Sequence, residues 1–155
     1  MRVLQSPSEL LALVGQDVAT SEWITVTQEQ VQQFAEATGD RQWIHLDEER
    51  ARSGPFGSTV AHGYLTLSLL PALVAGALEV RGVHMAINYG LNKVRFPAPV
   101  PVGSRLRAQL KLLGCDAIDA GGLQVAWLAT IEREGSDRPV CVAETLARLY
   151  PQADS

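Results

Sequence analysis

An acidic and a basic side chain stand five positions apart in the first third of the chain, at Asp40 and His45. Further along, Gly63 opens a long apolar segment. A carboxylate, an imidazole and the free N–H groups of a helix N-terminus are the groups needed to move protons beside a polarised carbonyl. We therefore take Asp40, His45 and Gly63 as the candidate chemical set.

Each of these residues also has an ordinary interpretation. Asp40 follows Gly39 and could be a turn residue, because aspartate favours turns. His45 could be a histidine satisfied within the fold, and Gly63 an ordinary glycine at a helix start. His62 precedes Gly63 and could be structural, with a hydrogen bond to the loop before it. The combination and its spacing favour chemistry over these separate explanations.

The elements around the acid and the base are readable from local signals. Thr27 followed three positions later by Gln30 is a capping box, which predicts a helix start. Apolar residues then recur at helical spacing until Gly39 supplies the stop, so Asp40 should lie just past a helix C-terminus. His45 is expected in a loop, since residues 40–46 show no periodicity. A short helix should follow from Asp47, and residues 53–59 are loop by their Gly and Pro content.

The segment from Tyr64 to Leu78 is apolar on nearly every face, which predicts a helix buried all round. Pro71 inside it should kink the helix or remove one backbone hydrogen bond. The segment is shorter than the roughly 20 residues of a membrane span, so we interpret it as a core helix and expect no membrane association.

Most of the remaining chain alternates between apolar and polar residues, as strands do. The clearest case begins at Arg105, and the small residues of 141–147 would let a helix approach a sheet closely. A strand over 23–27 and a short helix over 8–14 are expected near the N-terminus. The expected strands cover residues 86–96, 105–112, 125–131 and 140–150. This order predicts an α+β fold with an antiparallel sheet wrapped around a long buried central helix.

Length and composition set outer bounds on the function. The 155 residues suit one domain over 1–155, with 46% apolar and 19% charged residues. A net charge of −4 without a basic run argues against a nucleic-acid partner. Cys115 and Cys141 lack metal-ligand spacing and are interpreted as reduced core residues. Together with the absence of a signal-peptide core, they predict a cytoplasmic location.

Three segments in combination resemble the MaoC-like (R)-specific enoyl-CoA hydratases. The stretch from Phe34 to Asp40, followed by His45, is similar to the hydratase-2 motif of that family. Residues 61–70 resemble the segment that leads into the central helix of its hot-dog fold. Residues 88–100 resemble the branch named for nodulation protein N, which also holds mycobacterial 3-hydroxyacyl-thioester dehydratases.

The resemblance implies a single hot-dog domain that forms a homodimer through its sheets. It implies Asp40 and His45 as the catalytic pair and the Gly63 amide as the group that binds the thioester oxygen. Some members have a serine in the central helix where this chain has Pro71, and Ser68 is considered as its substitute. His62 and Ser68 are therefore grouped with Gly63 as candidate oxyanion or substrate-binding residues.

The expected activity is reversible addition of water across the C2=C3 bond of an enoyl thioester, as a hydro-lyase acting on an acyl-CoA or acyl-carrier-protein substrate. In the favoured order Asp40 accepts a proton from water and His45 delivers one to C2, an assignment that depends on protonation states. Neither a metal nor another cofactor is required. Two alternatives stay open, namely a hot-dog acyl-CoA thioesterase and a non-catalytic acyl-thioester binding module.

Overall fold

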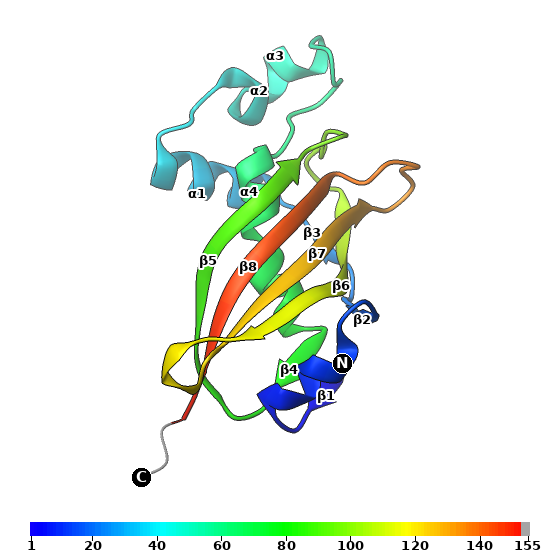
Figure 1. Cartoon of the computed structure of the whole chain (residues 1–155). Coiled ribbons are helices and arrows are strands. Elements are labelled where there is room, and N and C mark those ends of the chain that lie inside the picture. Colours follow the sequence, from blue (N-terminus) through cyan, green and yellow to red (C-terminus); the bar gives the residue numbers. More distant parts are fainter. Residues whose placement is uncertain (153–155) are drawn as a thin grey trace.

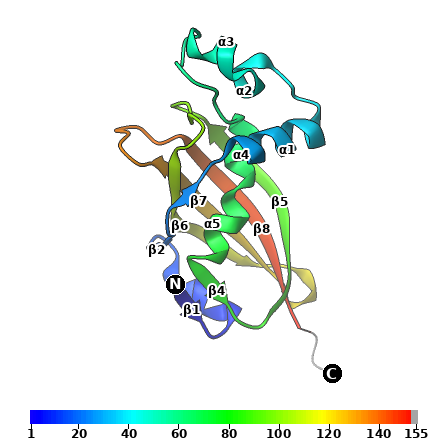
Figure 2. The ribbon, with the colours of Figure 1, turned by 180° about the vertical axis from the view of Figure 1, so that it is seen from behind.

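The computed structural model describes residues 1–152. Its main feature is an antiparallel sheet that curls around a helical segment (Figures 1 and 2). The strand order is β2-β6-β7-β8-β5, and the short β3 also pairs with β6. These strands are β2 (Asp17–Thr20), β3 (Ile24–Thr25), β5 (Val83–Arg95), β6 (Arg105–Ala117), β7 (Leu123–Arg133) and β8 (Cys141–Pro151).

The four long strands β5 to β8 lie where the sequence predicted strands, and β6 shows the alternation clearly, whereas β5 is exposed at most of its positions. In β6 the buried positions fall on alternate residues from Leu106 to Leu112. The small residues Cys141 and Ala143 on β8 are fully buried, and the first part of the helical segment packs against this strand. Both cysteines are free and buried, as expected. The α+β antiparallel fold class is therefore confirmed.

The short strands over residues 2–4, 17–20 and 78–80 were not expected. β1 (Arg2–Leu4) pairs in parallel with β4 (Leu78–Val80), and the expected strand over 23–27 is reduced to the two residues of β3. Segments of two to four residues are too short for alternation to identify them. Their pairing is fixed by tertiary contacts between segments far apart in the chain.

Helices cover one end and one face of the sheet. The 3₁₀ helix η1 (Pro7–Leu13) replaces the expected N-terminal helix over almost the same residues. α1 (Gln28–Thr38) has the predicted capping box at Thr27, and Gly39 ends it with a φ of 81°. The short helices α2 (Trp43–Leu46) and α3 (Glu48–Arg52) lie above the end of the sheet (Figure 1). A second 3₁₀ helix, η2 (Asp119–Gly121), joins β6 to β7.

The central helix is shorter and more exposed than predicted. It consists of α4 (Gly63–Ser68) and α5 (Leu70–Ala75), which meet at Leu69. Pro71 lies in the first turn of α5, where its missing N–H group has no intrahelical partner to lose. One face buries Leu65 and Leu73, whereas Tyr64 is 72% exposed. The prediction of all-round burial is therefore wrong for this chain, because its own sheet covers only one side of the helix.

None of the helices within residues 1–152 has the length and apolarity needed to cross a membrane.

Candidate active site

Asp40 owes its position to the end of α1. Gly39 adopts the left-handed conformation that terminates the helix, a conformation glycine adopts without steric cost. The Asp40 N–H donates to the Thr38 hydroxyl at 3.4 Å, and the Asp40 side chain is exposed. Asp40 therefore lies just past the C-terminus of α1, as the sequence predicted, and its carboxylate accepts a long hydrogen bond of 3.5 Å from the Gln42 N–H.

His45 lies in helix α2 and not in the predicted loop. A helix of four residues is too short to produce a periodic signal, which is why the sequence did not reveal it. The side chain is only 6% exposed. Its Nδ1 lies 2.6 Å from the Val60 carbonyl oxygen, and the Val60 N–H donates to the Ile44 carbonyl at 3.0 Å. Val60 thus holds the His45 ring through its carbonyl and helix α2 through its N–H group.

A second support for His45 comes from Gln28, at the start of α1. Its side-chain amide donates to the His45 carbonyl at 2.8 Å, and its amide oxygen accepts from the Thr59 hydroxyl at 2.6 Å. Sequence reasoning missed Gln28, Thr59 and Val60. The only local signal was a polar Thr59 before an apolar segment, and a backbone carbonyl such as that of Val60 leaves no sequence signal.

The environment of His45 keeps its ring neutral. Burial lowers the pKa of His45 below its ordinary value, and the neighbouring His62 lowers it further. The hydrogen bond to Val60 and the charge of Asp40 act in the opposite direction without reversing the shift. Because a carbonyl oxygen can only accept, Nδ1 carries the hydrogen. The neutral ring therefore presents the lone pair of Nε2 as its free, basic site.

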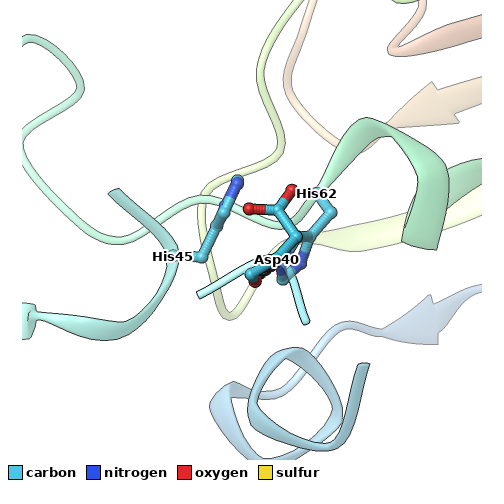
Figure 3. A group of neighbouring side chains, drawn as sticks. All are labelled: Asp40, His45 and His62. Atoms are coloured by element: carbon cyan, nitrogen blue, oxygen red, sulfur yellow. Dashed lines mark hydrogen bonds between the residues drawn. The ribbon is translucent and has the colours of Figure 1, made fainter. Parts of the chain in front are cut away.

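Asp40, His45 and His62 form one cluster, although they come from three chain segments (Figure 3). One functional atom from each side chain lies within 4.8 Å of the corresponding atoms of the other two. His62 is 2% exposed, and its Nε2 donates to the Asp40 backbone carbonyl at 2.9 Å. This bond agrees with the structural interpretation of His62 as a residue tied to the preceding loop.

The same three residue types could in principle bind a metal ion, but their geometry suits proton transfer better. The His45 and His62 rings are stacked, with centroids 3.8 Å apart and planes inclined by 23°. The lone pair of an imidazole nitrogen lies in the plane of its ring. Because the two ring planes are nearly parallel, they intersect much farther from the nitrogens than the ~2.0–2.1 Å length of a zinc–nitrogen bond. The two rings therefore do not converge on one ion.

Gly63 begins α4, so its N–H belongs to the helix end that lacks intrahelical acceptors. A Cβ atom at this position would lie 3.0 Å from the Phe96 ring, so it is an aromatic side chain that approaches closely. Gly63 and the buried Thr66 line a cavity of about 300 Å³ together with Phe56 and Phe96.

Ser68 lies at the other end of α4, away from Gly63. Its hydroxyl donates to the Tyr64 carbonyl at 2.7 Å. Ser68 lines a larger cavity of about 710 Å³ between the helical segment and the sheet, whose walls include Val74, Leu91 and Trp127. Neither Asp40 nor His45 is among the residues that line this cavity or the smaller one beside Gly63.

Comparison with known proteins identifies the family. Residues 9–132 match the model of the MaoC like domain. The chain is 55% identical over 148 residues to 3-hydroxyacyl-thioester dehydratase Z of Mycobacterium tuberculosis, covering 96% of this chain and 98% of the relative. This chain belongs to the MaoC-like family. Nodulation protein N of Rhizobium leguminosarum bv. viciae, a further relative, is 44% identical over 89% of this chain and 87% of its own length.

Solved structures agree with this MaoC-like assignment. The R-hydratase PhaJ1 from Pseudomonas aeruginosa, in its unliganded form, superposes with a TM-score of 0.67 at 26% identity. The alignment covers 90% of this chain and 83% of that structure. The resemblance noted from the sequence is thus confirmed, and the chain is a hydro-lyase, a dehydratase or hydratase of the MaoC-like family.

Proposed function

We propose that the protein is an (R)-specific trans-2-enoyl thioester hydratase and 3-hydroxyacyl-thioester dehydratase that uses Asp40 and His45 as its catalytic pair. The observation that carries this proposal is the buried, neutral His45, whose free ring nitrogen lies close to the exposed Asp40 carboxylate. A neutral imidazole beside a carboxylate is a suitable site for activating one water molecule. The (R) stereochemistry is supported by the named R-hydratase among the similar structures.

In the hydration direction His45 acts first as the base. Its Nε2 accepts a proton from water while the water oxygen bonds to C3, and the alkene electrons move to the thioester oxygen. Asp40 accepts a hydrogen bond from the second O–H group of the water and orients it. The His45 imidazolium then delivers its proton to C2 as the carbonyl re-forms. Dehydration is the reverse sequence.

This order reverses the assignment favoured from the sequence, which made Asp40 the base and His45 the acid. The reason is the tautomer, because a ring whose Nδ1–H donates to Val60 and whose pKa is lowered has no proton on Nε2 to give at the start. Asp40 then serves the reaction through its negative charge, which favours the imidazolium once that cation has formed.

The thioester oxygen would be stabilised by the Gly63 N–H at the start of α4. Free N–H groups at a helix N-terminus favour developing negative charge, and one such donor is worth about 3–4 kcal/mol in measured enzymes. The acyl chain would extend along the apolar cavity under α4 and α5, with Ser68 on its wall. Either coenzyme A or a carrier protein would supply the thioester.

We also propose a homodimer that forms through β5. This strand is the edge of the sheet, and an exposed edge is a template for pairing with another chain. It carries a run of exposed apolar side chains, namely Met85, Ile87, Tyr89 and Leu91. A second copy would cover these residues. A cytoplasmic location, where acyl thioesters are metabolised and thiols stay reduced, belongs to the same proposal.

The test is turnover of crotonyl-coenzyme A, with enoyl-thioester absorbance and free thiol followed together. We expect the absorbance to fall without thiol release, and the product to be oxidised by an (R)-specific but not an (S)-specific 3-hydroxyacyl dehydrogenase. Asp40→Asn and His45→Gln should each lose about 10²- to 10⁴-fold in kcat. Asp47→Asn and His84→Gln are the matched controls and should retain activity.

Other outcomes would change the proposal. Thiol release would make the protein a thioesterase. Binding without turnover, for this substrate and for longer or carrier-bound enoyl thioesters, would make it a non-catalytic acyl-thioester binding module. Full activity in both variants would remove Asp40 and His45 from the chemistry.

A further inference from the structure

We propose that His62 is a positioning residue that holds the Asp40 backbone, the His45 ring and the start of α4 in one rigid block. The inference rests on the proposed function of Asp40 and His45. It assigns His62 a role in their geometry and none in contact with substrate.

The contacts of His62 reach each part of the catalytic set. Its Nε2–H donates to the Asp40 carbonyl at 2.9 Å, across 22 positions of the chain. Its ring stacks on the His45 ring at 3.8 Å between centroids. His62 is also the residue directly before Gly63, at the N-cap of α4. One side chain thus contacts all three segments, in addition to the bonds that Gln28 and Val60 make between them.

The stack completes the restraint on His45. The hydrogen bond from Nδ1 to Val60 fixes one atom of the ring but still permits tilting about that bond. His62 supplies a surface on one face of the ring, and His62 itself contacts Phe34, with ring centroids 4.9 Å apart and planes inclined by 55°. The direction of the reactive Nε2 is therefore set by two restraints of different kinds.

The hydrogen-bonding state of His62 favours this role over ordinary packing. The side chain is almost fully buried, and its Nδ1 has no partner among residues 1–152. A buried polar atom without a partner destabilises a fold, so an apolar residue would serve packing better. The one hydrogen bond of the His62 ring goes to the backbone carbonyl of Asp40, a candidate catalytic residue, and this bond explains why the position holds an imidazole.

Two variants separate the two contacts. His62→Phe retains an aromatic face for His45 but loses the hydrogen bond to the Asp40 carbonyl. His62→Gln retains an amide donor for that carbonyl but loses the ring. We expect kcat to fall in both, by up to about 10²-fold, since small displacements of catalytic groups have effects of that size. KM should change little, because His62 is placed away from the substrate.

The pH profile gives a second readout. The groups that face the His45 ring are the Asp40 carboxylate, the Val60 carbonyl and the His62 ring. Both variants remove an imidazole that disfavours charge on His45, so the acidic limb of kcat/KM should move to higher pH. Phe34→Leu is the control for packing, because it changes an apolar neighbour of His62 without removing the bond to Asp40 or the stack on His45. It should lower Tm and leave kcat and the pH profile unchanged.

A measurement without substrate keeps this inference separate from the proposed function. ¹⁵N NMR of the histidine rings should show a single Nδ1–H tautomer for neutral His45 in the wild type. In His62→Gln the His45 ring signals should shift or broaden, because the ring is then free to tilt about its bond to Val60. If the wild type turns over no thioester, the proposed function fails and the ring spectra still decide the role of His62. Wild-type kcat and unchanged His45 spectra in both variants, with only Tm lowered as in Phe34→Leu, would overturn it.

Discussion

At the scale of single residues, the chemistry of this site depends on one buried imidazole. His45 is 6% exposed, and burial is the largest influence on its protonation. Asp40, only five positions earlier, is exposed. The acid and the base therefore meet at the boundary between core and solvent. This location lets a water molecule reach them while the ring remains uncharged.

The first prediction concerns the pH dependence of catalysis. Because burial lowers the pKa of His45 below the ordinary 6.5 and the neutral ring is the active form, activity should be lost only as the pH falls through that lowered pKa. We expect kcat/KM to be flat around neutral pH and to decline on the acidic side. An acidic limb centred above the ordinary histidine pKa would contradict a buried, neutral base.

The second prediction concerns stability and follows from the same shift. Between the lowered pKa of folded His45 and its unfolded value near 6.5, the unfolded chain binds more protons than the folded one. The free energy of unfolding should therefore decrease as the pH falls through this window. Urea unfolding of the wild type and of His45→Gln across the acidic range measures the effect. His45→Gln should lack this pH dependence of the free energy of unfolding. The same pH dependence in both proteins would contradict the prediction.

At the scale of elements, α1 presents Asp40 and α4 presents Gly63. The capping box of α1 is reciprocal, with Gln30 N–H donating to the Thr27 hydroxyl at 3.2 Å and Thr27 N–H donating to the Gln30 side chain at 3.1 Å. The helix then ends at Gly39. The start and the end of α1 are thus both fixed by local interactions, and Gln28 in its first turn also donates to the His45 carbonyl.

The third prediction separates the stability of helix α1 from the chemistry. Thr27→Ala removes the cap and should reduce the free energy of unfolding by about 1 kcal/mol, the usual cost of losing such a residue. kcat should be unchanged in the folded protein, because Thr27 bonds Gln30 and neither Asp40 nor His45, and the Gln28 side chain that supports His45 is retained. Denaturant unfolding and steady-state kinetics check both parts. A large loss of kcat in fully folded Thr27→Ala protein would mean that the Thr27 cap affects the geometry of the active site, contrary to the prediction.

The fourth prediction concerns the close contact at the start of α4. Gly63→Ala places a Cβ atom 3.0 Å from the Phe96 ring, which is tighter than ordinary van der Waals contact. The ring or the helix start must move, and we expect kcat to fall as the N–H of residue 63 is displaced. The double variant Gly63→Ala with Phe96→Leu should recover part of that loss, since the smaller side chain makes room. A Gly63→Ala enzyme with full activity would contradict the expectation.

At the scale of the whole molecule, helices cover one face of the sheet, whereas its edge strand β5 has no neighbouring strand on its outer side. The expected buried helix is half exposed in the single chain, and the exposed Tyr89 and Leu91 of β5 border the large cavity. Both features have the same physical meaning. One chain of this length does not cover all of its apolar surface, which is the basis of the proposed dimer.

The fifth prediction tests the dimer. Ile87→Lys puts a charge on the exposed edge of β5 and should shift the mass measured by light scattering from dimer to monomer. Leu11→Lys is the matched control, because Leu11 is also exposed but lies in η1, away from β5. A monomeric wild type would contradict the proposal. Loss of the dimer in both variants would mean that the dimer does not depend specifically on β5, contrary to the proposal.

The sequence by itself determined the parts of this protein that depend on neighbouring residues. The capping box at Thr27 and the stop at Gly39 defined α1, and strict alternation defined β6. The spacing of Asp40 and His45 was enough to single out the candidate pair, because both are near α1 in the chain. The resemblance to the MaoC-like family came from three local segments, residues 34–45, 61–70 and 88–100.

Only the tertiary structure decided what depends on residues distant in the chain. It placed His45 in a helix against the Val60 carbonyl, stacked His62 on its ring and brought Phe96 against Gly63. It also divided the central helix at Leu69 and left one side exposed. A local pattern states what each segment prefers. The tautomer of a ring and the reason for a glycine are set by partners that only folding brings within contact.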